Sequence, residues 1–220
     1  DFYLTNDATI DNQTGGNATT NYIVNANSTL TTNGTMSVYY GTIDGTSGTD
    51  AGGTVTIGGN LTIHGNIGAT NATSNFTISE WNSLTLASNV STFNSDNMTL
   101  SDNTVLNFGN VTSGYNRGSS ETLTFASNIT MGSNSTINVG NGTTLNGNIY
   151  GAGTLNVLGN FTSTGSIGAA QVDGADFITS GLEQINISKG NTFTLNNNAT
   201  ATRMNINGTV TVAGNITAAV

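Results

Sequence analysis

The chain contains no proline in 220 residues, whereas ordinary usage of about 5 % would supply roughly eleven. Proline has no backbone N–H to donate, so it is excluded from strands that are hydrogen-bonded on both sides. Glycine and asparagine, which turn corners easily, number 29 and 35. These counts favour a fold in which most strands have a neighbour on each side.

Alternation of side chains identifies the strands. Apolar residues alternate with Asn, Thr or Ser in short runs bounded by Gly or Asn, among them 54–57, 84–86, 122–125, 193–195 and 209–212. A period of two is the pattern of a strand with one apolar face. Only 168–184 is tempting as a helix, and its glycines weaken that interpretation. We therefore expect an ordered all-β protein, although Asn, Gly, Thr and Ser make up 56 % of the chain.

Internal repeats suggest the architecture. The segment 53–68 returns as 153–168 and, shortened, as 208–217, while 97–109 aligns with 128–140 at a distance of 31 positions. Degenerate repeats at uneven spacing suit a solenoid better than a propeller, whose blades need a regular length. We predict one parallel β-helix or β-solenoid domain over residues 1–220, with about ten coils of roughly 20 to 25 residues. The alternative is a β-sandwich that assembles by strand exchange.

The run 145–160 has the core Gly151-Ala-Gly153-Thr-Leu155. It resembles the passenger repeats of bacterial autotransporters and related surface β-helix proteins, and the resemblance covers residues 141–168. The resemblance implies a right-handed parallel β-helix that is displayed outside a cell. It supplies no catalytic residues.

Composition excludes several partners. Charged residues make up 7 % of the chain, and three cations against twelve acids give a net charge of -9. Such a chain has no basic patch for nucleic acid or for anionic membrane surfaces. No apolar run approaches the ~20 residues of a membrane span, so we expect no membrane insertion. The chain begins at Asp1, which is typical of a mature or excised fragment.

The triplet Asn-x-Ser/Thr, the acceptor of N-glycans, occurs 18 times, about twice the number expected from composition. The reversed triplet occurs only 10 times, although a merely alternating strand would produce both directions equally. We therefore predict covalent N-glycans, which would also hydrate a surface with few charges. The candidate sites are Asn12, Asn17, Asn27, Asn33, Asn60, Asn71, Asn75, Asn89, Asn97, Asn110, Asn128, Asn134, Asn141, Asn160, Asn186, Asn198, Asn207 and Asn215. The alternative is that the excess is a habit of the lineage or an accident.

Catalytic chemistry finds little support. The acids are scattered, and the closest pair, Asp173 and Asp176, lies in a Gly-rich stretch that suits a turn. His64 is the only histidine, and we expect it on the surface. The segment 44–53 is similar to a Ca²⁺-binding Gly-Asp loop. Such loops bind Ca²⁺ as consecutive repeats, and only one copy is present. We predict no enzyme, no catalytic residue, no cofactor and no metal site.

Ice binding would require Thr-x-Thr pairs stacked in register on a flat face. Seven such pairs start at Thr29, Thr54, Thr122, Thr162, Thr192, Thr200 and Thr209. Their spacing along the chain is irregular, which predicts that they do not form one regular array.

Self-assembly is the remaining function. Both ends of the sequence resemble strands rather than caps, and an uncapped solenoid exposes unpaired backbone groups. We predict a structural subunit of an N-glycosylated extracellular filament, sheath or lattice, with itself as partner and Phe2 and Tyr3 as apolar anchors at one junction. The alternative is a β-helical adhesin. The absence of cysteine, the sequons and a pI near 4.1 suggest a prokaryotic cell surface, with N-glycans favouring archaea.

Overall fold

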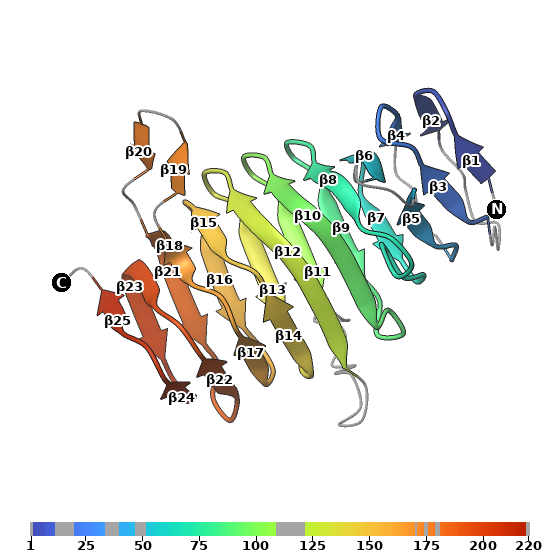
Figure 1. Cartoon of the computed structure of the whole chain (residues 1–220). Coiled ribbons are helices and arrows are strands. Elements are labelled where there is room, and N and C mark those ends of the chain that lie inside the picture. Colours follow the sequence, from blue (N-terminus) through green and yellow to red (C-terminus); the bar gives the residue numbers. More distant parts are fainter. Residues whose placement is uncertain are drawn as a thin grey trace.

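The computed structural model describes residues 2–11, 20–33, 40–46, 52–108, 122–169, 171–173, 176–178 and 181–218. These residues form strands, turns and connecting segments, with no helix among them. The strands lie side by side in a long, oblique stack that runs from the N-terminus to the C-terminus (Figure 1). The prediction of an all-β protein is confirmed.

Nearly all strand pairs are parallel, and they fall into three series that we call ladders A, B and C. Ladder A contains β1 (Phe2–Leu4), β3 (Tyr22–Val24), β5 (Ile43–Gly45), the bridging residue Ile67, the first parts of β10 (Thr92–Leu100) and β12 (Leu123–Met131), β14 (Thr143–Asn146), β17 (Phe161–Ser163), β22 (Thr192–Leu195) and β24 (Thr209–Val212).

Ladder B follows ladder A along the chain. It contains β2 (Ala8–Asp11), β4 (Thr29–Asn33), β6 (Gly52–Gly58), β8 (Thr73–Ile78), the second parts of β10 and β12, β15 (Ile149–Gly151), β18 (Ile167–Ala169), the first part of β23 (Ala199–Ile206) and β25 (Ile216–Ala218).

Ladder C comes third. It contains β7 (Leu61–Ile63), β9 (Ser83–Leu86), β11 (Val105–Phe108), β13 (Thr136–Val139), β16 (Thr154–Val157), β21 (Leu182–Ile187) and the second part of β23. Between β18 and β21 the chain forms a separate antiparallel pair, β19 (Gln171–Asp173) and β20 (Asp176–Ile178).

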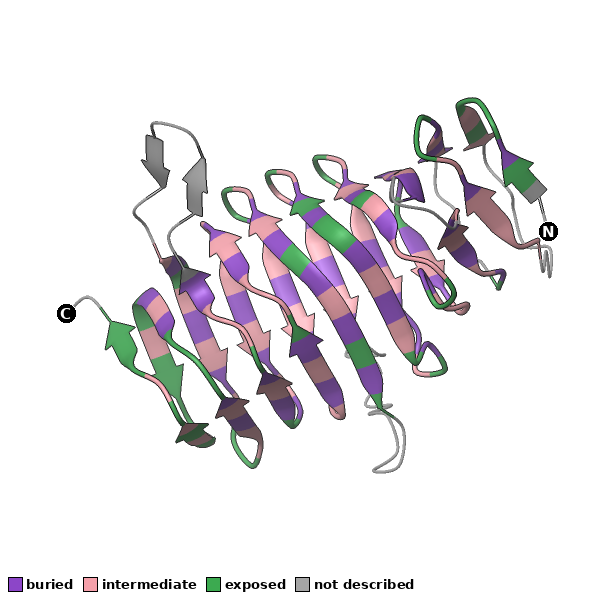
Figure 2. Ribbon diagram, in the orientation of Figure 1, coloured by how far each residue is buried: buried purple, intermediate pink, exposed green. Residues whose placement is uncertain are grey.

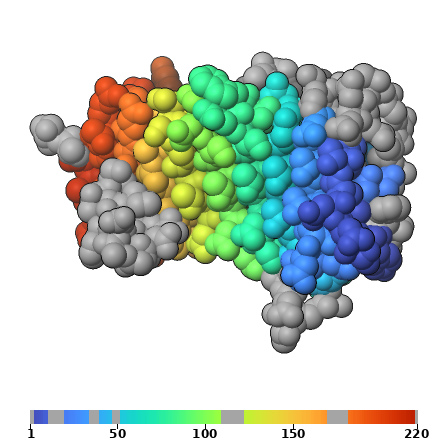
Figure 3. All heavy atoms as spheres, turned by 90° about the horizontal axis from the view of Figure 1, so that it is seen from above, coloured from blue at the N-terminus to red at the C-terminus, as the bar shows by residue number. Residues whose placement is uncertain are grey.

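We call one passage through the ladders a rung. Equivalent positions on successive rungs are as few as 17 and as many as 32 residues apart. The connections between strands therefore differ in length from rung to rung, while the strands keep their register. Figure 3 shows the rungs following one another in sequence order along the molecule.

The two kinds of sequence repeat have different structural meanings. The 31-residue repeat is one rung, because Asn97 pairs with Asn128 on ladder B and Leu106 pairs with Ile137 on ladder C. The repeat that begins at residues 53, 153 and 208 is instead a strand, a corner and a strand. Its first strand lies on ladder B in β6, on ladder C in β16 and on ladder A in β24.

One core receives side chains from all three ladders. Along each strand, buried apolar residues alternate with half-buried or exposed polar ones, as the banding in Figure 2 shows. Phenylalanines stack on neighbouring rungs, with ring centroids 4.2 Å apart for Phe93 and Phe125 and 5.3 Å apart for Phe161 and Phe193. Register thus brings like residues together, and each layer of the core packs on the next.

Buried hydroxyl groups near the corners find acceptors in the local backbone. Ser135 Oγ donates to the carbonyl of Gly132 at 2.7 Å, and Thr104 Oγ1 donates to that of Ser101 at 2.9 Å. These bonds offset the cost of burying a hydroxyl. By contrast, the hydroxyls of Ser28, Thr32 and Thr73 are buried without a hydrogen-bond partner in the described part of the chain.

Candidate functional surfaces

An asparagine ladder runs along the outer side of ladder C. In each step an Asn Nδ2 donates at 2.8 Å to the Asn Oδ1 of the preceding rung, and the first member donates to Thr85 Oγ1 at 3.1 Å. The members are Asn107, Asn138, Asn156, Asn186 and Asn205. Sequence reasoning missed this feature, although its signal is visible: an Asn between two apolar residues recurs in β11, β13, β16, β21 and β23.

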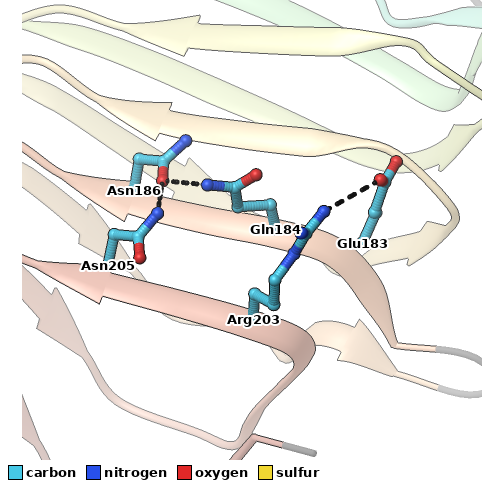
Figure 4. A network of polar contacts seen from close by, with 5 residues as sticks. All are labelled: Glu183, Gln184, Asn186, Arg203 and Asn205. Carbon is cyan, nitrogen blue, oxygen red and sulfur yellow. Dashed lines mark hydrogen bonds and ion pairs between the residues drawn. The ribbon is translucent and has the colours of Figure 1, made fainter.

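The asparagine ladder is directional. Because every Nδ2 points toward the preceding rung, the Oδ1 of Asn205 is the end acceptor of the series on the C-terminal side. Figure 4 shows this last step, in which Asn186 Oδ1 accepts from both Asn205 and Gln184. Beside it, Arg203 and Glu183 form an exposed ion pair at 3.3 Å. An exposed pair of this kind contributes little to stability.

The last rung leaves core residues uncovered. Ile206 is 49 % exposed and Ile216 is 39 % exposed, although both occupy inward positions, stacked on Ile187 and Ala199. Met204, Val210 and Val212 are only partly buried against the core. These five residues form what we call the C-terminal edge.

Backbone groups are open at the same edge. The N–H groups of Thr209 and Ala213 donate back to the carbonyls of Asn191 and Leu195. In a parallel ladder successive residues direct their N–H and C=O groups to opposite sides. The N–H and C=O groups of Val210 and Val212 therefore point away from the preceding rung, where a further strand could pair with them.

The N-terminal rung presents a different surface. Tyr3 is 62 % exposed, and the side chain of Phe2, its expected partner as an anchor, lies outside the described residues. Tyr3 borders a groove of about 700 Å³ on the outside of ladder A, which Ile23, Asp44 and Asn71 also line. In this groove Asp44 Oδ1 accepts from the backbone N–H of Thr70 at 2.9 Å.

The described sequons lie on the surface. Asn27, Asn33, Asn60, Asn75, Asn89, Asn97, Asn128, Asn134, Asn160, Asn198, Asn207 and Asn215 are exposed, and Asn71, Asn141 and Asn186 are half-buried. Asn12, Asn17 and Asn110 lie outside the described residues. Their use as glycan sites stays a prediction.

Corner residues give the sequons a structural role that the sequence did not reveal. The side-chain oxygen of an Asn or Asp at a corner accepts from the backbone N–H one rung later, as in Asn141 to Asn160 at 3.1 Å and Asn160 to Thr192 at 2.9 Å. The same contact is made by Asp7, Asn21, Asp44, Asn60, Asn66, Asp102, Asn128, Asn148 and Asn198.

This role has a direction along the chain. At Asn60, Asn160 and Asn198 the residue two positions later is a half-buried Thr on the outward side of the following strand, and at Asn128 it is a half-buried Thr on the outward side of the second part of β12. A corner acceptor followed by an outward Thr produces Asn-x-Thr and not its reverse. The directional excess of sequons therefore has a structural source that does not require glycosylation.

The sequons fall into two classes, according to whether the side-chain Nδ2 of the Asn donates a hydrogen bond. A glycan is attached to Nδ2, so an Asn that uses only Oδ1 can carry one without losing its corner bond. Asn89 and Asn186 instead donate through Nδ2, to the His64 carbonyl at 2.6 Å and to Asn156 at 2.8 Å. A glycan at Asn186 would stand within the asparagine ladder.

Candidate catalytic groups remain apart. His64 stacks on Tyr40 with centroids 4.7 Å apart, and its Nδ1 lies 3.1 Å from Asn89 Oδ1. Among the described residues no group of three His, Cys, Asp or Glu side chains is placed to hold a metal ion. The side chains of Asp173 and Asp176, and part of the segment 44–53, lie outside those residues.

Threonines form regular rows, although the seven Thr-x-Thr pairs do not lie in one array: the pairs at Thr29 and Thr54 are on ladder B, and those at Thr122, Thr192 and Thr209 are on ladder A. The row on ladder A is Thr92, Thr124, Thr144, Thr162, Thr194 and Thr211, and the row on ladder B is Thr9, Thr31, Thr56, Thr77, Thr99 and Thr130. Each row has one Thr on each of six consecutive rungs. The spacing along the chain does not reveal these rows, because rungs differ in length while the strand pairing stays in register.

Comparisons with known proteins give no relative. No protein-family model, no curated protein and no solved structure matches the chain. In the described ranges, no helix has the length and apolar character needed to cross a membrane. The surfaces of the molecule are therefore the basis on which a function can be proposed.

Proposed function

We propose that the chain is a structural β-solenoid subunit of an N-glycosylated extracellular assembly, and that it polymerises through its open strand ends. Support for the solenoid comes from three parallel ladders that send their apolar residues into one core. Closure of the ladders around that core would leave edges only at the first and last rungs, as in other solenoids. No chemistry beyond the backbone and the core is needed, and we propose no enzymatic activity.

The C-terminal edge is the observation that carries the proposal. Val210 and Val212 direct backbone groups away from the molecule, beside the exposed apolar side chains of Ile206 and Ile216. A strand that pairs there gains main-chain hydrogen bonds and covers the apolar residues together. Such an open edge normally causes association.

A second copy of the chain is the proposed occupant. Among the described residues its first rung also has one unpaired side, because there β1 pairs only with β3 and β2 only with β4. A contact between the first rung of one copy and the last rung of the next is head-to-tail, and a head-to-tail contact produces a filament.

Proline substitution tests the edge while keeping its backbone hydrogen bonds to the preceding rung. Val210→Pro and Val212→Pro together remove two N–H groups that have no partner in the preceding rung, and proline is tolerated in edge strands. The matched control, Thr211→Pro, removes an N–H that faces the preceding rung, so it should destabilise the chain. We expect filaments of the 220-residue protein by electron microscopy and a monomer for the double variant. Monomeric wild-type protein at high concentration would refute the proposal.

An adhesin remains the second candidate because of the groove beside Tyr3. This groove has a volume of about 700 Å³ and combines an exposed aromatic ring with polar groups. A monomeric chain that binds a glycan array through this groove, and loses binding on Tyr3→Ala, would favour the adhesin.

A further inference from the structure

The outside of ladder A carries a two-row surface that we call the Thr array. Its first row is Thr92, Thr124, Thr144, Thr162, Thr194 and Thr211, and its second row is Thr122, Gly142, Asn160, Thr192 and Thr209. Neighbouring members of a row are one strand apart, about 4.8 Å, and the two rows are two residues apart, about 6.7 Å. Six rungs extend the first row over roughly 24 Å.

The chemistry of the Thr array is uniform. Nine of its eleven members are Thr, the others are Gly and Asn, and none is charged or aromatic. Each Thr presents one methyl group and one hydroxyl group, and the strands between the first and last rungs of the array are hydrogen-bonded on both sides. A shallow groove of about 360 Å³ separates the rows, lined by Thr144, Thr162 and Thr194 on one side and by Asn160 and Thr192 on the other.

We propose that the Thr array binds ice. The surface of hexagonal ice is a neutral lattice of oxygen atoms whose repeats are close to the two spacings of the array. Hydroxyl groups at such spacings can bond to lattice oxygens, while the methyl groups order water in the groove between the rows. A charged side chain would hold its own hydration shell and disrupt this match, and the array has none.

Other ligands fit less well. Nucleic acid and other polyanions require cations, and sugar-binding surfaces use aromatic rings, which the array lacks. Ladder B also has a row of threonines, but its second row includes the sequons Asn75, Asn97 and Asn128. The second row of the Thr array includes one sequon, Asn160, so ice binding by the array requires that Asn160 carry no glycan. The inference does not depend on end-to-end assembly.

Lysine substitutions on one rung test the assignment. Thr144→Lys places a long charged side chain in the middle of the array, and Thr154→Lys makes the same change on ladder C of the same rung, where Thr154 is also half-buried on the outward side. Thr99→Lys tests ladder B. All variants are first compared with the wild-type chain by thermal unfolding.

The assay is partition into a slowly growing ice sphere, supported by inhibition of ice recrystallisation. We expect the wild-type chain, Thr154→Lys and Thr99→Lys to be incorporated into ice, and Thr144→Lys to lose at least about tenfold of that incorporation. Exclusion of the wild-type chain from ice would overturn the proposal. So would loss of incorporation in Thr99→Lys or Thr154→Lys with Thr144→Lys unaffected. The double proline variant at the C-terminal edge should still enter ice, which separates this proposal from the assembly.

Discussion

Replacing Asn156 by Ala should destabilise the folded chain by interrupting the asparagine ladder at its centre. Asn156 Nδ2 donates to Asn138, and its Oδ1 accepts from Asn186, each at 2.8 Å. The variant loses both hydrogen bonds and leaves one acceptor and one donor unpaired on half-buried neighbours.

The magnitude follows from the two lost bonds. A hydrogen bond contributes about 1 kcal/mol net, so we expect the free energy of unfolding to fall by about 2 kcal/mol. In a chain of this size that corresponds to a melting temperature lower by roughly 4 to 8 °C. Urea unfolding followed by circular dichroism measures the loss.

Two further variants separate the hydrogen bonds from the loss of side-chain bulk. Thr154→Ala removes an outward side chain from the same strand but not from the asparagine ladder, so it should cost less than about 0.5 kcal/mol, as most surface changes do. Asn156→Asp places a carboxylate opposite the Asn138 oxygen, and acidification should stabilise it because the protonated group donates again. Equal losses for Asn156→Ala and Thr154→Ala would refute the reasoning.

Three other results are expected. Thr32→Val should raise the free energy of unfolding by about 1 kcal/mol, because it replaces a buried hydroxyl that lacks a partner with a methyl group of the same shape; lower stability in urea would contradict this. Burial raises the pKa of Tyr22. The contribution of Tyr22 to the free energy of unfolding should therefore be intact below the pKa of an unfolded tyrosine, about 10, and should be lost as the pH rises through the higher pKa of the folded state. A pH series should therefore show less alkaline destabilisation in Tyr22→Phe than in the wild-type chain, and identical curves would exclude the effect. Glycopeptide mass spectrometry of the native protein should find glycans at exposed sequons other than Asn89 and Asn160, but not at Asn186, and a glycan on Asn186 would show that the asparagine ladder does not protect it.

The strand content was predictable from the sequence because it depends on local order. In β6 and β24, Thr and apolar residues alternate, and the alternation decides which side chains enter the core. The 31-residue repeat likewise predicted a true neighbour relation, because Asn97 and Asn128 lie in consecutive rungs without a change of ladder.

Ladder assignment was not predictable, because the same strand-corner-strand motif serves all three ladders. The segments at 53 and 153 look alike, yet one starts on ladder B and the other on ladder C. Register between rungs depends on how much chain each connection contains, and connections tolerate changes of length at little cost. The rows of threonines and the asparagine ladder were therefore invisible as rows.

Sequon direction illustrates a different limit. Counting the triplets could not distinguish an enzyme's recognition rule from a corner rule, since both favour Asn before Thr. The second cause is revealed by the corner bonds, such as that from the backbone N–H of Thr192 to Asn160 Oδ1 and that from the backbone N–H of Asn215 to Asn198 Oδ1.

Hydrogen exchange of the C-terminal edge as a function of protein concentration tests the central claim most directly. The amides of Val210 and Val212 point away from the preceding rung, whereas that of Thr209 donates to Asn191. If subunits add strands at this edge, exchange at Val210 and Val212 should slow strongly as concentration rises, while Thr209 is protected throughout. Exchange at Val210 and Val212 that is equally fast at all concentrations would contradict the account.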